Sequence, residues 1–102
     1  MKIKITESIQ TTREIDVTFP CYRYDKSEED TIEIHTNYKF TEDKVYSVRR
    51  STDMYGDTEL KIETKRHIKL NGWGFLFKPE NESNEEDFLD ALSKAKYYLN
   101  GF

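Results

Sequence analysis

The most reactive side chains in this sequence are one cysteine, Cys21, and two histidines, His35 and His67. A cysteine nucleophile needs a base beside it to form the thiolate. His35 falls on the polar face of one alternating segment and His67 on the charged face of another, and no spacing brings either ring to Cys21. We therefore predict that Cys21 is a passive thiol and that the protein is not an enzyme. A hydrolase that uses Cys21 is the third-ranked hypothesis.

Metal ligation is the next chemistry to consider. Protein metal sites gather His, Cys or carboxylate ligands at characteristic spacings, which two separated histidines and one cysteine do not provide. The segment Asp53-Met54-Tyr55-Gly56-Asp57 partly resembles a calcium loop, but it lacks the remaining ligands and the closing glutamate. No glycine-rich phosphate loop is present. The sequence thus predicts no metal and no cofactor, and it predicts an ordinary loop at 53–57 with Gly56 at positive φ.

Basic side chains recur in the middle of the chain. Lys61, Lys65 and Lys69 share one parity of an alternating segment, and Arg49 and Arg50 come from a segment that could lie beside it. The simpler interpretation is a solvated outer face, which antiparallel sheets commonly have. The functional interpretation is a basic patch for RNA or for an acidic protein surface. The predicted partner-binding residues are Arg49, Arg50, Tyr55, Lys61, Lys65, Arg66 and Lys69.

The charge of the chain is unevenly distributed. The 102 residues carry a net charge of −4, yet residues 44–69 hold seven basic and four acidic residues. Residues 25–33 and 79–102 are each strongly acidic. An acidic balance disfavours sequence-independent binding to nucleic acid, because that affinity comes from neutralised phosphates. The acidic runs Glu28-Glu29-Asp30 and Glu85-Glu86-Asp87 are expected to be solvated, but either could meet a basic groove on a partner.

The sequence also bears on the cellular location. One cysteine cannot form an intrachain disulfide, which suits a reducing cytoplasm. The N-terminus has no apolar stretch of the kind found in signal peptides. No run approaches the ~18 apolar residues of a transmembrane helix. We predict a cytoplasmic protein of one domain, residues 1–102, with no membrane partner.

Most of the chain alternates apolar and polar residues with period two, as antiparallel strands do. Residues 2–19 predict a hairpin that turns at Gln10-Thr11-Thr12, and residues 32–40 and 45–51 predict further strands. Ser27-Glu28-Glu29-Asp30 is expected to be a charged turn. If the strand 32–40 lies at a sheet edge, it could pair with a second copy, so the sequence leaves the oligomeric state open.

The dipeptide Asn71-Gly72 is a strong signal for a two-residue hairpin turn. The stretch around it also partly matches the RNA-recognition octapeptide, K/R-G-F/Y-G/A-F-V-x-F/Y, but Asn71 and Lys78 fail at its two ends. That fold interleaves two helices with four strands, whereas this chain shows one helical pattern. The hairpin is therefore the favoured interpretation. Its register would pair Leu70 with Trp73, Ile68 with Phe75, and Arg66 with Phe77.

After Pro79 the period changes to that of a helix. Ser83-Asn84-Glu85-Glu86 fits a capping box, with Ser83 as N-cap and Glu86 at N3. Apolar residues then recur at three- and four-residue steps through residues 84–100. The sequence therefore predicts an α+β fold: a single antiparallel sheet of about five to six strands from residues 1–78, with one C-terminal amphipathic helix packed across it.

Both ends of the chain carry a recognisable pattern. The segments MKIKITESIQTTREIDVTFPCYRY and NEEDFLDALSKAKYYL together resemble small accessory proteins of phages and prophages of Bacteroidota, through an N-terminal hairpin that ends in an aromatic-Pro-x-Tyr segment and a helix with an acidic start. Some proteins of this size and origin are anti-CRISPR proteins. The resemblance implies a non-enzymatic inhibitor, in the cytoplasm of an infected or lysogenic host, that binds a type VI-B RNA-guided RNase or its guide-RNA complex.

Two other functions stay open at this point. One is a small RNA-binding module that uses the basic strand face, with Arg49, Arg50, Lys65, Arg66 and Lys69 as the contacting residues. Its affinity would fall steeply with salt, because each phosphate contact releases counterions. The other is a phage accessory protein with a different protein partner. The inhibitor is ranked first and the RNA-binding module second.

Overall fold

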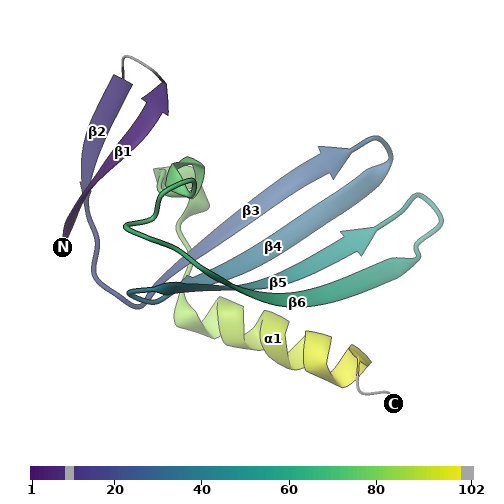
Figure 1. Ribbon diagram of the computed structural model, residues 1–102. Coiled ribbons are helices and arrows are strands. Elements are labelled where there is room, and N and C mark those ends of the chain that lie inside the picture. The colour runs from purple at the N-terminus through teal and green to yellow at the C-terminus, as the bar shows by residue number, and fades with distance from the viewer. Residues whose placement is uncertain (9–10, 100–102) are drawn as a thin grey trace.

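The computed structural model describes residues 1–8 and 11–99 and confirms the α+β class, with strands in the majority and one C-terminal α-helix. Figure 1 shows that the strands divide between two antiparallel sheets, of two and four strands, where the sequence predicted one sheet. The elements are β1 Lys2–Ser8, β2 Thr11–Asp16, β3 Cys21–Glu29, β4 Ile32–Phe40, β5 Lys44–Thr52, β6 Thr58–Arg66 and α1 Glu85–Leu99, with short 3-10 helices at Gly74–Leu76 and Pro79–Asn81.

The small sheet is the predicted N-terminal hairpin. Ile3 lies opposite Ile15, and the backbone N–H of Val17 donates to the carbonyl of Met1, 2.7 Å away, beyond the end of the ladder. Of the turn predicted at Gln10-Thr11-Thr12, both threonines belong to β2, and Gln10 lies outside the described residues. Figure 1 shows that this hairpin stands apart from the larger sheet, near its β3–β4 side.

The large sheet has the order β3-β4-β5-β6, so each strand pairs with its sequence neighbours. The prediction for residues 32–40 is confirmed by β4, but β4 lies between β3 and β5 and is no edge strand. The charged turn predicted at Ser27–Asp30 is shorter than expected. Ser27, Glu28 and Glu29 continue β3, and the chain reverses at Asp30 and Thr31, with Asp30 at a φ of 57°.

The two faces of the large sheet are covered by different elements. Alternation places Phe40 and Val45 on one face and Tyr46 and Val48 on the other. The first face packs against the hairpin and the loop after β6, through buried Ile3, Ile5, Val17, Phe40, Val45, Leu70, Leu76 and Phe77. The second face packs against α1, through buried Val48, Phe88 and Ala95 with partly buried Tyr22, Tyr46, Leu60, Ala91 and Leu92. The sheet is therefore shared between two hydrophobic clusters.

The prediction of a hairpin at Asn71-Gly72 is wrong. Strand β6 ends at Arg66, and residues 74–76 form a 3-10 helix in place of a returning strand. Ile68 and Phe75, which the predicted register buries as a pair, are 80% and 53% exposed. Lys69 and Leu70 both have positive φ, which no strand residue adopts.

The physical reason lies at His67, which is buried although its strand parity predicted a charged face. Its Nε2–H donates to the carbonyl of Thr41, 2.7 Å away, and its Nδ1 accepts the backbone N–H of Leu70 at 3.2 Å. The ring thus folds the chain back immediately after β6 and carries Leu70 into the first cluster. Trp73 then packs edge-on against Phe40, at 5.7 Å between ring centroids. Burial of these side chains outweighs the local preference of Asn71-Gly72 for a hairpin.

The helix is confirmed, but it begins one residue later than the capping box predicted. Asn84 is the N-cap: its Oδ1 accepts the backbone N–H of Asp87 at 2.8 Å, and its amide donates to the Asp87 carboxylate at 3.3 Å. Ser83, predicted as the cap, instead donates its backbone N–H to the carbonyl of Tyr22 at 3.2 Å. Asn81 donates to the carbonyl of Tyr24 at 3.0 Å, so the segment before the helix covers part of the β3 edge.

Candidate functional site

Three of the predicted partner-binding residues meet on the sheet face opposite α1. Arg49 of β5 lies directly opposite Lys61 of β6, and Lys65 lies two positions further along the same face of β6. Glu63 sits between the two lysines, with its carboxylate 2.9 Å from the ammonium of Lys61 and 3.8 Å from that of Lys65. The hydrogen bond from Lys61 lowers the pKa of Glu63, and the charges of Lys61, Lys65 and Arg49 act in the same direction. On this face Arg49, Lys61 and Lys65 surround the Glu63 carboxylate.

The other predicted partner-binding residues lie elsewhere. Arg50 and Arg66 have the opposite parity and lie on the α1 side of the sheet. Lys69 belongs to the turn after β6. Tyr55 lies in the loop between β5 and β6 and is 83% exposed. The predicted set of seven is therefore split over two faces and two loops.

The acidic segments are also divided. Asp25 and Glu29 of β3 share the face that carries Arg49, because Asp25 lies opposite Thr36 of β4, which lies opposite Arg49 of β5. Glu28 lies on the α1 side and Asp30 in the turn. The open face thus runs from an acidic edge at β3, past Arg49 of β5, to an edge at β6 where two lysines alternate with two glutamates. Charge segregation of this kind suits a partner with a complementary pattern.

A groove of about 950 Å³ lies between α1 and the sheet. His35 forms part of its wall, although the sequence placed this ring on a plainly polar face. The His35 Nδ1 contacts the Tyr24 hydroxyl, and its Nε2–H donates to the Glu33 carboxylate at 2.6 Å. The hydrogen bond from His35, together with Lys26 nearby, lowers the pKa of Glu33. The arrangement holds the Tyr24 phenol and the imidazole in fixed positions along the groove.

This groove was missed by the sequence analysis. Alternation in β4 separates an apolar set that includes Phe40 from a polar set that includes His35 and Asn37, and helices usually cover the apolar set. Here α1 covers the polar set, because Val48 and Tyr46 of β5 share its face and supply the apolar surface. The sequence of β5 carries an indication of this arrangement, because apolar residues occur on both of its faces. Only the register between β4 and β5 reveals it.

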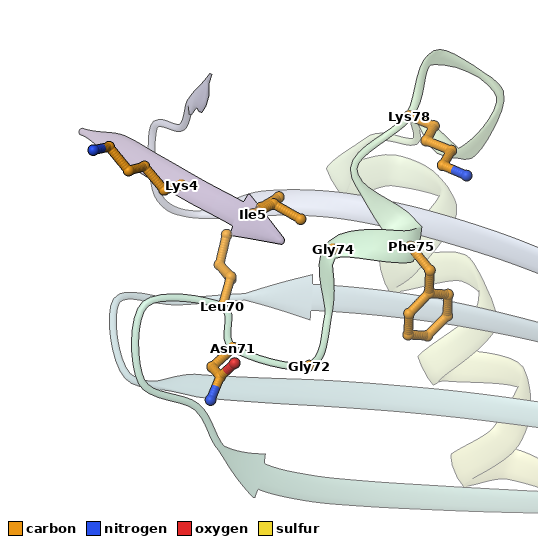
Figure 2. A pocket seen from close by; sticks show the side chains of 8 residues that line it. All are labelled: Lys4, Ile5, Leu70, Asn71, Gly72, Gly74, Phe75 and Lys78. Atoms are coloured by element: carbon orange, nitrogen blue, oxygen red, sulfur yellow. The ribbon is translucent and has the colours of Figure 1, made fainter. Parts of the chain in front are cut away.

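A second pocket, of about 560 Å³, opens beside the Asn71–Lys78 stretch (Figure 2). Lys4 and Ile5 of β1 line one side of this pocket, and Leu70, Asn71 and Phe75 of the segment after β6 line the other (Figure 2). A Cβ added at Gly74 would lie 2.2 Å from Ile5 Cγ2. Gly74 is thus where β1 crosses the chain after β6.

Cys21 lies against the first hydrophobic cluster and is a free thiol. Burial raises the pKa of its thiol above the usual value, and the nearby Arg23 offsets this only in part. The raised pKa leaves little thiolate at neutral pH. Both ring nitrogens of His67 bond to backbone groups, and both of His35 bond to side chains. These bonds commit both histidine rings to partners other than the thiol.

The calcium-like loop is organised by hydrogen bonds to the side chain of its first aspartate. Asp53 Oδ1 accepts the N–H groups of Tyr55 and Asp57 at 2.9 and 3.0 Å, and Gly56 has a φ of 83°, as predicted. The Asp53 carboxylate therefore shapes the turn. Within residues 1–8 and 11–99, no three His, Cys, Asp or Glu side chains gather in a way that could hold a metal ion.

A search for membrane-spanning helices finds none among the described residues that is long and apolar enough. Comparison with known proteins gives no match to a family model, to a curated protein or to a solved structure.

Proposed function

We propose that this protein is a non-enzymatic, phage-type binding protein that inhibits a host RNA-guided RNase. It acts in the cytoplasm of the infected or lysogenic bacterium and contacts the effector or its guide-RNA complex. The proposal follows from the resemblance of both chain ends to phage accessory proteins. One structural observation supports it most: Arg49, Lys61 and Lys65 lie on one charged sheet face.

The mixed charge of this face favours a protein partner over bare RNA. Glu59 and Glu63 alternate with Lys61 and Lys65 along β6. A phosphate backbone that contacted either lysine would therefore also lie beside a carboxylate. Neighbouring carboxylates weaken phosphate contacts, because that affinity comes from the neutralisation of phosphates by Lys and Arg. A folded partner can instead place its own charges to match the alternating pattern.

The test is an RNA-cleavage assay with the purified guide-RNA effector complex, with and without this protein. Arg49→Glu should abolish inhibition, since it reverses charge on the open face opposite Lys61. Arg50→Glu is the matched control: the same charge change occurs at the adjacent residue, which faces α1, so inhibition should persist. If the wild-type protein neither binds the complex nor slows cleavage, the proposed target is wrong.

The same purified protein can be used to test the RNA-binding alternative. Binding to RNA alone, with an affinity that falls steeply as salt rises, would move the function to direct RNA recognition. A flat response to salt would exclude phosphate contacts. Binding to a protein other than the nuclease would leave a phage accessory role through another partner.

A further inference from the structure

Strand β6 is a free edge of the four-stranded sheet. Within the described residues its strand neighbour is β5, and it lies at the end of the order β3-β4-β5-β6. The opposite edge, β3, is partly covered by Asn81, Glu82 and Ser83. Within the described residues, the part of β6 beyond Thr58 has no partner on its outer side and is a ready template for pairing with another strand.

The backbone groups that β6 turns outward can be identified. Asp53 donates its N–H to the carbonyl of Asp57 at 3.0 Å, in the same register as the β5–β6 ladder. Hydrogen-bonded pairs alternate in an antiparallel ladder, so the odd-numbered residues of β6 bond to β5. The even-numbered residues Leu60, Ile62 and Thr64 therefore turn their N–H and C=O groups away from the sheet.

The side chains of β6 form a self-complementary pattern. Glu59, Lys61, Glu63 and Lys65 alternate in sign along the open face. When β6 pairs antiparallel with a second β6 about a two-fold axis at Ile62, Glu59 faces Lys65 and Lys61 faces Glu63. All four positions then meet the opposite charge, which stabilises cross-strand pairs.

Neighbouring registers lack this match. An axis at Lys61 sets lysine against lysine and Glu59 against Glu63, and an axis at Glu63 sets Glu63 against Glu63 and Lys61 against Lys65. Like charges directly opposite each other destabilise a strand pair. The charge alternation therefore selects the register centred on Ile62.

The other face of β6 is apolar at the same point. Ile62 is 39% exposed, and Leu60, one pair along, belongs to the second hydrophobic cluster. At the two-fold axis the two Ile62 side chains would cover each other. At the strand end, the Thr58 carbonyl already accepts the Tyr98 hydroxyl at 3.1 Å, so the new ladder spans Leu60 to Thr64 of each copy.

We propose that two copies of this chain join their β6 edges antiparallel about Ile62, in a continuous sheet held in register by the Lys61–Glu63 and Glu59–Lys65 pairs. A two-fold interface of this kind uses the same patch on both subunits and closes the edge of each. The interface goes beyond the proposed inhibition, since it requires no host protein.

The first test is sedimentation equilibrium of the full chain, whose monomer mass is 12.2 kDa, over a wide concentration range. The wild-type protein should show twice that mass. Lys61→Glu should weaken the dimer about tenfold or more, because it sets carboxylates against each other at two symmetry-related positions. Its fold should be kept, since the ion pair with Glu63 that it removes lies at the surface, and the new carboxylate would face Arg49 across the ladder.

The reciprocal variant Lys61→Glu/Glu63→Lys distinguishes register from general electrostatics. It restores opposite charges at each pair and should recover wild-type association. Amide exchange gives an independent readout: Leu60, Ile62 and Thr64 should become protected as concentration rises. A wild-type protein that stays monomeric, a dimer indifferent to Lys61→Glu, or a double variant that fails to recover would each overturn the proposal.

Discussion

At the scale of single residues, two positions decide the shape of the chain after β6. His67 bonds at both ring nitrogens, to the Thr41 carbonyl and to the Leu70 amide, and this turns the chain inward. Gly74 then passes so close to Ile5 that a methyl group would overlap it. Arg13 of β2 donates to the Gly74 carbonyl at 3.1 Å, so the crossing is held from both strands of the hairpin.

The Gly74 contact gives a prediction. Gly74→Ala should destabilise the protein by about 1–3 kcal/mol, because the added Cβ would lie 2.2 Å from the buried Ile5 side chain. Ile5→Ala alone should cost about 2–5 kcal/mol as a cavity variant. In the double variant the new methyl group occupies the vacated space, so the loss should be smaller than the sum. Urea unfolding measures all three, and strict additivity would contradict the close contact.

At the scale of elements, the start of α1 shows how a local motif is shifted by its surroundings. Ser83 and Asn84 are both good N-cap residues, and both are followed three positions later by an acidic residue. The structure uses Asn84, because the Ser83 amide is committed to the Tyr22 carbonyl of β3. The edge of the sheet therefore sets where the helix begins.

The cap assignment is testable by a matched pair of variants. Asn84→Ala should lower the free energy of unfolding by about 0.5–2 kcal/mol, since it removes the acceptor of the Asp87 amide. Ser83→Ala should change stability by only a few tenths of a kcal/mol, because its contact with Tyr22 uses the backbone. Thermal unfolding followed by circular dichroism measures both. The reverse order would restore the capping box predicted from Ser83 and Glu86.

At the scale of the whole molecule, two hydrophobic clusters share one sheet. Phe40 and Val45 belong to the cluster under the hairpin, and Val48, on the same strand as Val45, belongs to the cluster under α1. The same backbone hydrogen bonds hold the side chains of both faces of a strand in place. If β5 separates from its neighbours, the packing on both faces is lost. The two clusters should therefore unfold together.

This cooperativity can be followed with two probes. Trp73 is the single tryptophan and packs in the first cluster, whereas ellipticity at helix wavelengths reports α1 on the opposite face. Phe88→Ala removes a buried ring of the second cluster and should cost about 3–5 kcal/mol. Fluorescence and ellipticity should nonetheless give one shared midpoint, shifted equally in the variant. Two separate midpoints would show that the clusters unfold independently.

The sequence by itself determined the elements whose pattern depends on near neighbours. Period-two alternation located β2, β4 and β5, and three- and four-residue spacing located α1, because each period reports which side chains share a face. The Gly56 turn was predictable for the same local reason, a positive φ that glycine tolerates.

The tertiary structure alone decided how those faces are used. The helix covers the His35 face of β4 because β5, paired in a register that sequence does not display, brings Val48 and Tyr46 to that side. Asn71-Gly72 forms no hairpin because His67 and Leu70 gain more from burial than the turn gains locally. Division of the strands into two sheets leaves β6 at the end of the larger one, with β5 as its strand neighbour within the described residues. Contacts between residues far apart in sequence carry these choices, and a one-dimensional pattern holds no record of them.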